Sequence, residues 1–124
     1  MGYLASLKPV PSPFLVHGQL SESARRGEKI FKQAGCADCH VPGSAFTDMH
    51  PYDVGTRGPN DKTTDKFYTP TLIELWRTAP FLHDGSAPTV RDVVTAHNPK
   101  DEHGETSKLT SQEIDDLCAY VLSL

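Results

Sequence analysis

The chain has 124 residues and a mass of 13.6 kDa, which is the size of a single domain. Only 37% of its residues are hydrophobic, and ten prolines and nine glycines leave few residues for long regular elements. We therefore expect a thin core that needs a disulfide, a metal or a cofactor for stability. The net charge of -4 argues against a nucleic-acid-binding protein, so we expect no nucleic-acid partner.

No stretch approaches the roughly 18 consecutive apolar residues of a membrane span. Residues 1–14 also lack the charged start and apolar centre of a signal peptide. The sequence therefore predicts no membrane span in this chain, and a location either in the cytoplasm or outside it after removal of an export signal.

The first 13 residues differ in character from the rest. Three prolines within residues 9–13 predict an extended, semi-rigid linker. Residues 2–7 match residues 119–124 at Tyr, Ser and Leu in the same register, which suggests part of an internal repeat, with chance similarity as the alternative. We expect residues 1–13 to be the tail of a preceding domain plus a Pro-rich linker, and residues 14–124 to form the domain proper.

The first predicted helix begins at Ser21, a good N-cap residue, and leads to Gly35. One of its faces carries Gly27, Ile30, Phe31 and Ala34 at helical spacing. Residues 41–66 are rich in Pro, Gly, Asp and Thr without a sustained period, which predicts a long loop. A loop of that length in a small domain usually wraps around something.

Two short helices are predicted next. One begins at Thr69 and Pro70 and reaches about Trp76. The other begins at Thr89 and ends before Asn98, with Val90, Val93, Val94 and His97 on one stripe.

The last predicted helix has the strongest signals, because Thr110 and Glu113 form a capping box and Leu109 can pack on Ile114. Its buried stripe comprises Ile114, Leu117, Cys118, Val121 and Leu122. No period-2 alternation occurs, so the predicted fold class is all-α, with about four short helices and long loops.

Cys36, Cys39 and His40 have the Cys-x-x-Cys-His spacing of a c-type haem attachment site. Two thiols one turn apart can add to the two vinyl groups on one edge of the macrocycle, and the adjacent imidazole then points at the iron. Cys36 and Cys39 would hold one covalent haem, and His40 would be its proximal ligand. The haem would supply the apolar bulk that the composition lacks.

Two other kinds of site also use a Cys-x-x-Cys motif. A thioredoxin-like redox pair expects a βαβ pattern around the cysteines, which is absent. A zinc site could use His97 and His103 with the two cysteines, but residues 40–96 separate the two halves by far more than a compact zinc finger allows. A zinc-stabilised binding module stays as an alternative.

The sequence resembles the c-type cytochromes, in particular the haem domains of the bacterial di-haem cytochrome c peroxidase family. The resemblance extends from Leu20 to Leu124. It rests on the haem motif and on four further segments, residues 45–48, 52–55, 67–72 and, most specifically, 78–89. It implies a cytochrome c-type fold in which the N-terminal and C-terminal helices cross beside the haem. Gly27 would then be the small residue that lets Tyr120 approach closely.

The chain departs from that family in one respect. A functional di-haem peroxidase has two Cys-x-x-Cys-His motifs, and this sequence has one. The chain is therefore not expected to be an enzyme on its own, and a peroxidase-like haem domain that needs a second haem from its parent protein is the alternative.

The sixth iron ligand decides between electron transfer and peroxide chemistry. His97 is the first choice, because it lies on an apolar stripe and at the place where the family supplies an axial methionine. His103, in a charged loop before the last helix, is the second choice and Met49 the third, and an open site is the remaining alternative. His50 and His83 complete the candidates. A histidine ligand would make the haem bis-histidine and low-spin.

Other residues are expected near the haem. The resemblance gives His83 a structural role in a His-Asp-Gly segment. Possible hydrogen-bond donors to the haem propionates are Tyr68, Trp76, Arg77 and Arg57, with a surface position as the alternative for the two arginines. Cys118 is expected to be an inert apolar filler.

These observations predict a monohaem domain that transfers single electrons to or from a redox partner protein or an adjoining redox domain. Since thioethers form outside the bacterial cytoplasm, the protein is expected to be periplasmic or secreted.

Overall fold

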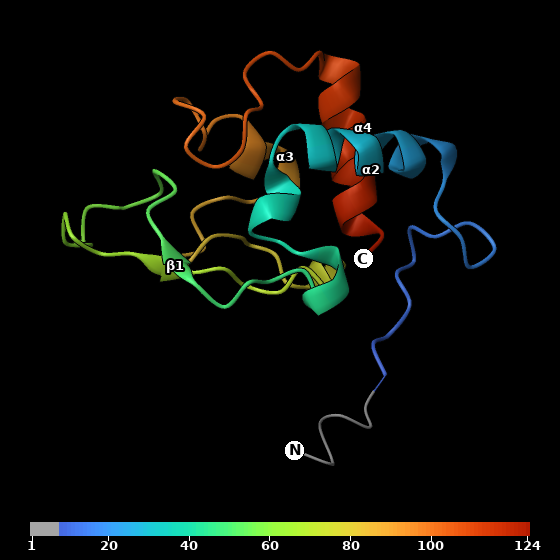
Figure 1. The fold of residues 1–124 in the computed structure, drawn as a ribbon, viewed down its shortest axis with the longest axis horizontal. Helices are drawn as coiled ribbons and strands as arrows, with labels where there is room; N and C mark the ends of the chain where they lie inside the picture. The colour runs from blue at the N-terminus through green and yellow to red at the C-terminus, as the bar shows by residue number, and fades with distance from the viewer. Residues whose placement is uncertain (1–7) are drawn as a thin grey trace.

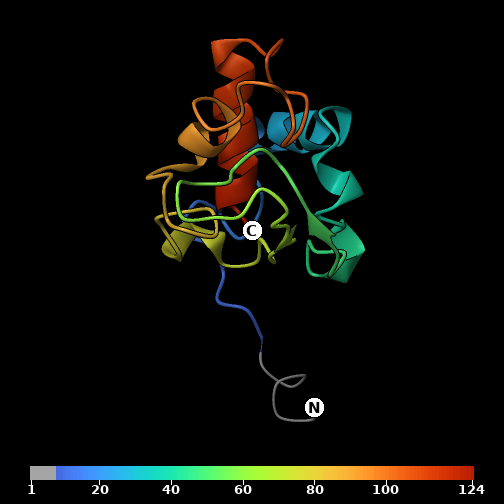
Figure 2. The same ribbon diagram turned by 90° about the vertical axis from the view of Figure 1, so that its left-hand side faces the viewer.

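The structure, a computed structural model, describes residues 8–124. Two helices, α2 and α4, cross each other, and the chain between them is mostly loop (Figures 1 and 2). We call α2 and α4 the helix pair and residues 35–109 the loop region. In chain order the elements are α2 (Glu22–Gln33), 3₁₀ turns at Cys36–Asp38 and Pro42–Ser44, β1 (Pro51–Tyr52), β2 (Phe67–Tyr68), a 3₁₀ turn at Leu75–Arg77, α3 (Val90–Val94) and α4 (Ser111–Leu122).

The first helix forms as its sequence predicts. The hydroxyl of Ser21 accepts a hydrogen bond from the backbone N–H of Ala24 at 3.1 Å, which caps α2. Glu22 in the first turn and Lys32 in the last turn complement the helix dipole. Gly35 follows with a φ of 84°, a left-handed conformation that ends the helix and turns the chain towards Cys36.

The close crossing of α2 and α4 depends on Gly27. A methyl group at this position would overlap the backbone carbonyl of Asp116 and lie 2.9 Å from the Cβ of Tyr120. The absent side chain lets the ring of Phe31 pack edge-on against Tyr120, with 5.2 Å between the ring centres. Phe31 and Leu117 are fully buried at this crossing. The expected role of Gly27 is therefore confirmed.

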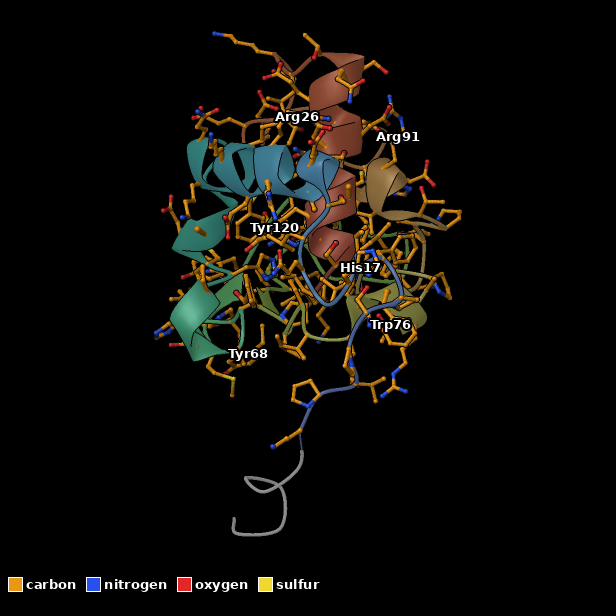
Figure 3. All side chains as sticks on the ribbon, turned by 90° about the vertical axis from the view of Figure 1, so that its right-hand side faces the viewer. His17, Arg26, Tyr68, Trp76, Arg91 and Tyr120 are labelled. Carbon is orange, nitrogen blue, oxygen red and sulfur yellow. The ribbon has the colours of Figure 1, made fainter. Side chains whose placement is uncertain are left out.

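An ion pair between a buried carboxylate and a half-exposed arginine also links the two helices. Asp116 is only 2% exposed, and its carboxylate accepts hydrogen bonds from Arg26 at 2.9 and 3.1 Å and from Ser23 at 2.6 Å. Gln112 donates a further bond to it at 3.0 Å. Figure 3 shows Arg26 on α2 beside the upper part of α4. These bonds lower the pKa of Asp116 to about 2.

The capping box of Thr110 and Glu113 is present at the start of α4, as predicted. A second capping box, formed by Thr89 and Asp92, starts α3. The helix ends after Val94, and the backbone of Thr95 leaves helical geometry. His97 therefore lies beyond α3, so the helical stripe predicted to include it does not extend that far.

The helix predicted from Thr69 to Trp76 is wrong in extent. Only a 3₁₀ turn at Leu75–Arg77 forms there. Thr69 is tied instead to the carbonyl of His50, beside a short antiparallel ladder that pairs β1 with β2. The described residues thus contain three α-helices, where about four were predicted, together with long loops and one ladder of two-residue strands that the all-α prediction did not include.

Residues 8–13, expected to be a linker, contact the domain. The backbone N–H of Val10 donates to Glu74 at 2.7 Å, and the buried hydroxyl of Ser12 donates to the carbonyl of Leu122 at the end of α4 at 2.5 Å. The segment of the suggested repeat at residues 2–7 lies outside the described residues. None of the helices within residues 8–124 is both long enough and apolar enough to cross a membrane.

Candidate haem-binding site

A cavity of about 440 Å³ lies between the helix pair and the loop region. Its volume is in the range of small-molecule and cofactor sites. Much of its wall is apolar and comes from both α2 and α4 as well as from the loops. These lining side chains are Phe31, Leu72, Leu75, Phe81, Leu82, Val90, Val93, Val94, Leu117 and Val121.

The three residues of the predicted attachment motif line this cavity together. Cys36 and Cys39 lie on the 3₁₀ turn that follows α2, and the N–H of His40 donates to the carbonyl of Cys36 at 2.9 Å. Both thiols are free. Burial raises the pKa of Cys36 to about 11. The environment thus favours thiols rather than thiolates.

The ring of His40 is oriented by one backbone contact. Its Nδ1 lies 3.0 Å from the carbonyl oxygen of Phe46. Because a carbonyl oxygen only accepts, Nδ1 must donate, and Nε2 keeps its lone pair. Burial also lowers the pKa of His40, which favours the neutral form that binds metals. This arrangement is typical of a metal-bound histidine.

His103 is the imidazole that faces His40. The two ring centres lie 6.3 Å apart with 33° between the planes, and His103 also lines the cavity. A metal–nitrogen distance of about 2 Å puts each ring centre about 3 Å from an ion between them, hence about 6 Å from the other centre. Burial, and to a smaller extent His40, lower the pKa of His103 to about 4. The Nδ1 of His103 is buried and has no hydrogen-bond partner within the described part of the chain.

Asn98 holds the loop that carries His103. Its side-chain NH₂ donates to the carbonyls of His103 and Gly104 and to the hydroxyl of Thr106, at 3.1, 2.9 and 2.8 Å. Its carbonyl accepts the N–H of His103 at 2.8 Å. Asn98 is 4% exposed. The sequence identified Asn98 only as a helix stop, because nothing local reveals bonds to residues five to eight positions away.

The other ligand candidates lie elsewhere. His97 lines a neighbouring pocket of about 120 Å³, which shares Glu102 with the haem cavity, and His97 does not line the haem cavity itself. Met49 is 72% exposed, and neither it nor His50 lines the haem cavity. The set of Cys36, Cys39, His97 and His103 that a zinc site would need is likewise not gathered among the described residues.

His83 lines the cavity, in agreement with a place near a haem. Its ring stacks on Phe67 with 3.6 Å between the ring centres, and its Nε2 lies 2.6 Å from a carboxylate oxygen of Asp61. Asp61 also accepts the backbone N–H of Gly58 at 2.7 Å. Sequence reasoning did not identify Asp61, because residues 62–82 separate it from its partner.

Of the four expected propionate donors, only Tyr68 lines the cavity. Figure 3 shows Trp76 near the N-terminal segment and well away from Tyr68. Arg77 pairs with Glu74, and Arg57 pairs with Asp53. A tyrosine that the sequence did not single out, Tyr52, also lines the cavity, and its hydroxyl donates to Asp48 at 2.6 Å.

Cys118 does not line the cavity. It is partly buried on α4 and packs against the core, and burial raises its pKa to about 11. These properties agree with the expected role of an inert filler.

The residues around the cavity fit a covalently attached haem. The wall offers two protonated thiols and an apolar surface for the macrocycle. It also offers the imidazole of His40, which a backbone carbonyl orients, and the imidazole of His103 at a suitable separation. The buried and unpartnered Nδ1 of His103 is a further sign that a group belongs between the loops and the helices.

Comparisons with known proteins agree with this site. The family model described as cytochrome c matches residues 24–124. The chain is 31% identical to the gamma subunit of hydrazine synthase from Kuenenia stuttgartiensis, across 98% of this chain and 47% of that protein. It is 32% identical to cytochrome c551 peroxidase from Nitrosomonas europaea, across 60% of this chain and 27% of that protein.

Solved structures give the same result. Kuenenia stuttgartiensis hydrazine synthase, pressurised with xenon, superposes with a TM-score of 0.82 at 30% identity over 98% of this chain and 52% of that chain. A MauG-like protein associated with microbial copper homeostasis superposes with a TM-score of 0.65 at 26% identity, over 87% of this chain and 48% of that chain.

The chain spans about half the length of these proteins, or less. Its matches include members of the di-haem cytochrome c peroxidase family, and the cytochrome c model covers most of its length. The cavity, the Cys-x-x-Cys-His motif and these matches lead to one conclusion: the chain belongs to the cytochrome c family, whose members carry a covalently bound c-type haem and transfer electrons.

Proposed function

We propose that this chain is a monohaem electron-transfer domain of a larger redox protein, with the haem held by Cys36 and Cys39 and its iron bound by His40 and His103. The separation of 6.3 Å between the two imidazole centres carries this proposal, because it matches two rings on opposite sides of one metal. The haem supplies a one-electron couple between ferric and ferrous iron.

The protein residues set how that couple is used. Phe46 orients His40 through its carbonyl, and Asn98 fixes the loop that presents His103. With an imidazole on each side, the site leaves no open position for peroxide or oxygen. Much of the remaining wall is apolar and offers a surface for the macrocycle. This combination favours transfer of single electrons over chemistry on a bound substrate.

His103 replaces His97 as the preferred sixth ligand in this proposal. The sequence favoured His97 because a helical stripe was expected to aim it inward. The helix ends at Val94, and His97 lies on the wall of a different pocket. His103 is instead buried opposite His40.

Absorption and electron paramagnetic resonance spectra of the haem-loaded protein test this proposal. We expect a low-spin, six-coordinate ferric spectrum without the far-red charge-transfer band of a methionine–iron bond. His103→Ala should convert it to a high-spin spectrum, whereas the matched variant His97→Ala should leave it low-spin. A protein without a Soret band would contradict the haem site, and a high-spin His97→Ala variant with low-spin His103→Ala would return the ligand role to His97.

A peroxidase-like haem domain is the second candidate. It is supported by the likeness to cytochrome c551 peroxidase, of which the chain spans 27%. Such a domain would need a second haem from a partner or parent protein. Addition of hydrogen peroxide separates the two functions, because a filled sixth position predicts no rapid spectral change, whereas a peroxidatic haem predicts one.

The proposed partners and location follow from the chemistry. A haem domain of this kind needs a redox partner protein or an adjoining redox domain to deliver and remove electrons. We place the protein in the bacterial periplasm or outside the cell, because thioether attachment of haem takes place there.

A further inference from the structure

His83 separates the haem cavity from two partly exposed carboxylates. Its ring forms part of the cavity wall, and its Nε2 lies 2.6 Å from Asp61 and 4.0 Å from Asp84. The side chains of Asp61 and Asp84 are 20% and 36% exposed. The imidazole therefore has the cavity on one side and a hydrated acidic surface on the other, which offers protons a short path from solvent.

The polar contacts of His83 are with acidic groups. Phe67 covers the face of the ring, and the charged groups that contact the imidazole within residues 8–124 are the two carboxylates, both anionic. Hydrogen bonds from the N–H of Gly58 and from His83 lower the pKa of Asp61, which keeps it ionised. Because an ionised carboxylate only accepts, Nε2 carries a hydrogen, and a further proton binds at Nδ1.

The other titratable groups on the cavity wall are less suited to exchange a proton near neutral pH. Cys36, Cys39, His40 and His103 are taken up by the proposed haem attachment and ligation, which leaves Tyr52, Tyr68, His83 and Glu102. The hydrogen bond to Asp48 raises the pKa of Tyr52 to about 12. Histidine is the side chain that ordinarily changes charge between pH 5 and 8.

We infer that His83 takes up a proton from solvent when the haem is reduced, so that electron transfer by this domain is coupled to proton uptake at the Asp61–His83 pair. The inference rests on the proposed haem function. In the balanced step, one electron from the redox partner converts ferric to ferrous haem, and one proton from water converts the neutral His83 imidazole to an imidazolium. No other bond forms or breaks.

The sign of the coupling follows from charge. Reduction removes one positive charge from the pocket, and this favours a cation on the wall. Because His83 lines the cavity, the change of one unit charge at the haem would be felt at the imidazole, and an electrostatic effect of this kind changes a proton affinity by on the order of tenfold. The reduction potential should therefore fall as pH rises. Since a tenfold change in an equilibrium constant corresponds to about 59 mV for one electron, the potential should fall by about 59 mV in total across the pH range of the coupling.

A spectroelectrochemical titration of the haem-loaded protein from pH 5 to 9 tests this inference. The unaltered protein should show a potential that falls with pH, and His83→Asn should remove that slope. Asp61→Asn should move the pH-dependent part of the potential curve to lower pH, because the imidazolium loses its nearest anion. The matched control His17→Asn, at an exposed histidine outside the cavity, should leave the profile unchanged.

The outcomes separate this inference from the proposed function. A protein that lacks haem contradicts the proposed function. A low-spin haem whose potential is independent of pH overturns only the coupling. A pH-dependent potential that persists in His83→Asn also overturns it, and points to the propionates or Glu102 as the proton-binding group. If His83→Asn does not assemble, Asp61→Asn decides, because an unshifted profile in that variant also overturns the role of the pair.

Discussion

The helix pair and the loop region differ in what stabilises them. In the helix pair, the helix caps and an ion pair to the buried carboxylate of Asp116 satisfy polar groups, and edge-on aromatic packing fills the crossing. The loop region instead surrounds a cavity of about 440 Å³. His103, whose buried Nδ1 has no hydrogen-bond partner among the described residues, lies on the wall of this cavity. The difference indicates that the helix pair is held mainly by contacts between its own residues, whereas the loop region depends more on the group that fills the cavity.

The largest predicted effect comes from preventing haem attachment. In the double variant Cys36→Ser and Cys39→Ser, the apolar wall of the cavity would face water, so residues 41–88 should lose their ordered arrangement. Hydrogen exchange should show near-complete loss of protection there, with partial protection retained in α2 and α4. Cys118→Ser, outside the cavity, should keep both haem and protection. Equal protection of the loops with and without haem would contradict the contrast between the two regions.

The next effect lies within the helix pair. Gly27→Ala forces a methyl group into the carbonyl of Asp116, so the helices must move apart. We expect a loss of about 3 kcal/mol or more in the free energy of unfolding of the haem-loaded protein. Gly43→Ala is the matched control, because a methyl group at Gly43 meets no atom within 4 Å. Chemical denaturation measures both, and equal stabilities would show that the helix crossing tolerates a larger spacing.

A smaller loss is expected at the loop that carries His103. Asn98→Ala removes the side chain that makes four hydrogen bonds to this loop, and it leaves buried carbonyls without a donor. We expect a cost of about 2–3 kcal/mol and a partly high-spin haem spectrum, because His103 loses its positioning. Asn60→Ala, at an exposed asparagine, should change neither quantity. A fully low-spin spectrum in Asn98→Ala would contradict the positioning role.

The smallest effect concerns pH. The pKa of Asp116 is about 2 in the folded protein, below the value of about 3.9 for an unfolded chain. The carboxylate therefore stabilises the fold above about pH 4, and this contribution is lost as pH falls towards 2. Asp116→Asn should cost about 2 kcal/mol at pH 7, and the difference from the unaltered protein should shrink below pH 4.

The neighbouring residue supplies the control for that titration. Asp115 pairs with Arg91 at the surface, where its side chain is 61% exposed. Asp115→Asn should therefore change stability by less than about 0.5 kcal/mol at either pH. The same pH dependence in both variants would show that the buried pair has no special contribution.

Much of the helix pair was predictable, because its signals are local. The N-cap at Ser21 and the capping box at Thr110 act within one turn, and Gly27 identifies the close crossing once the two helices are known. The predictions failed where longer-range bonds dominate. Thr69 follows β2 and hydrogen-bonds to His50 instead of starting a helix, and Asp92 caps a helix too short to include His97.

For the site, the sequence by itself determined the chemistry. The spacing of Cys36, Cys39 and His40 specifies the haem attachment motif, because these residues act through a single turn of the chain. Only the tertiary structure decided which imidazole faces His40 and which carboxylate accompanies His83. The physical reason is that loops are positioned by hydrogen bonds between distant residues, such as those of Asn98, and these bonds leave no periodic pattern in the sequence.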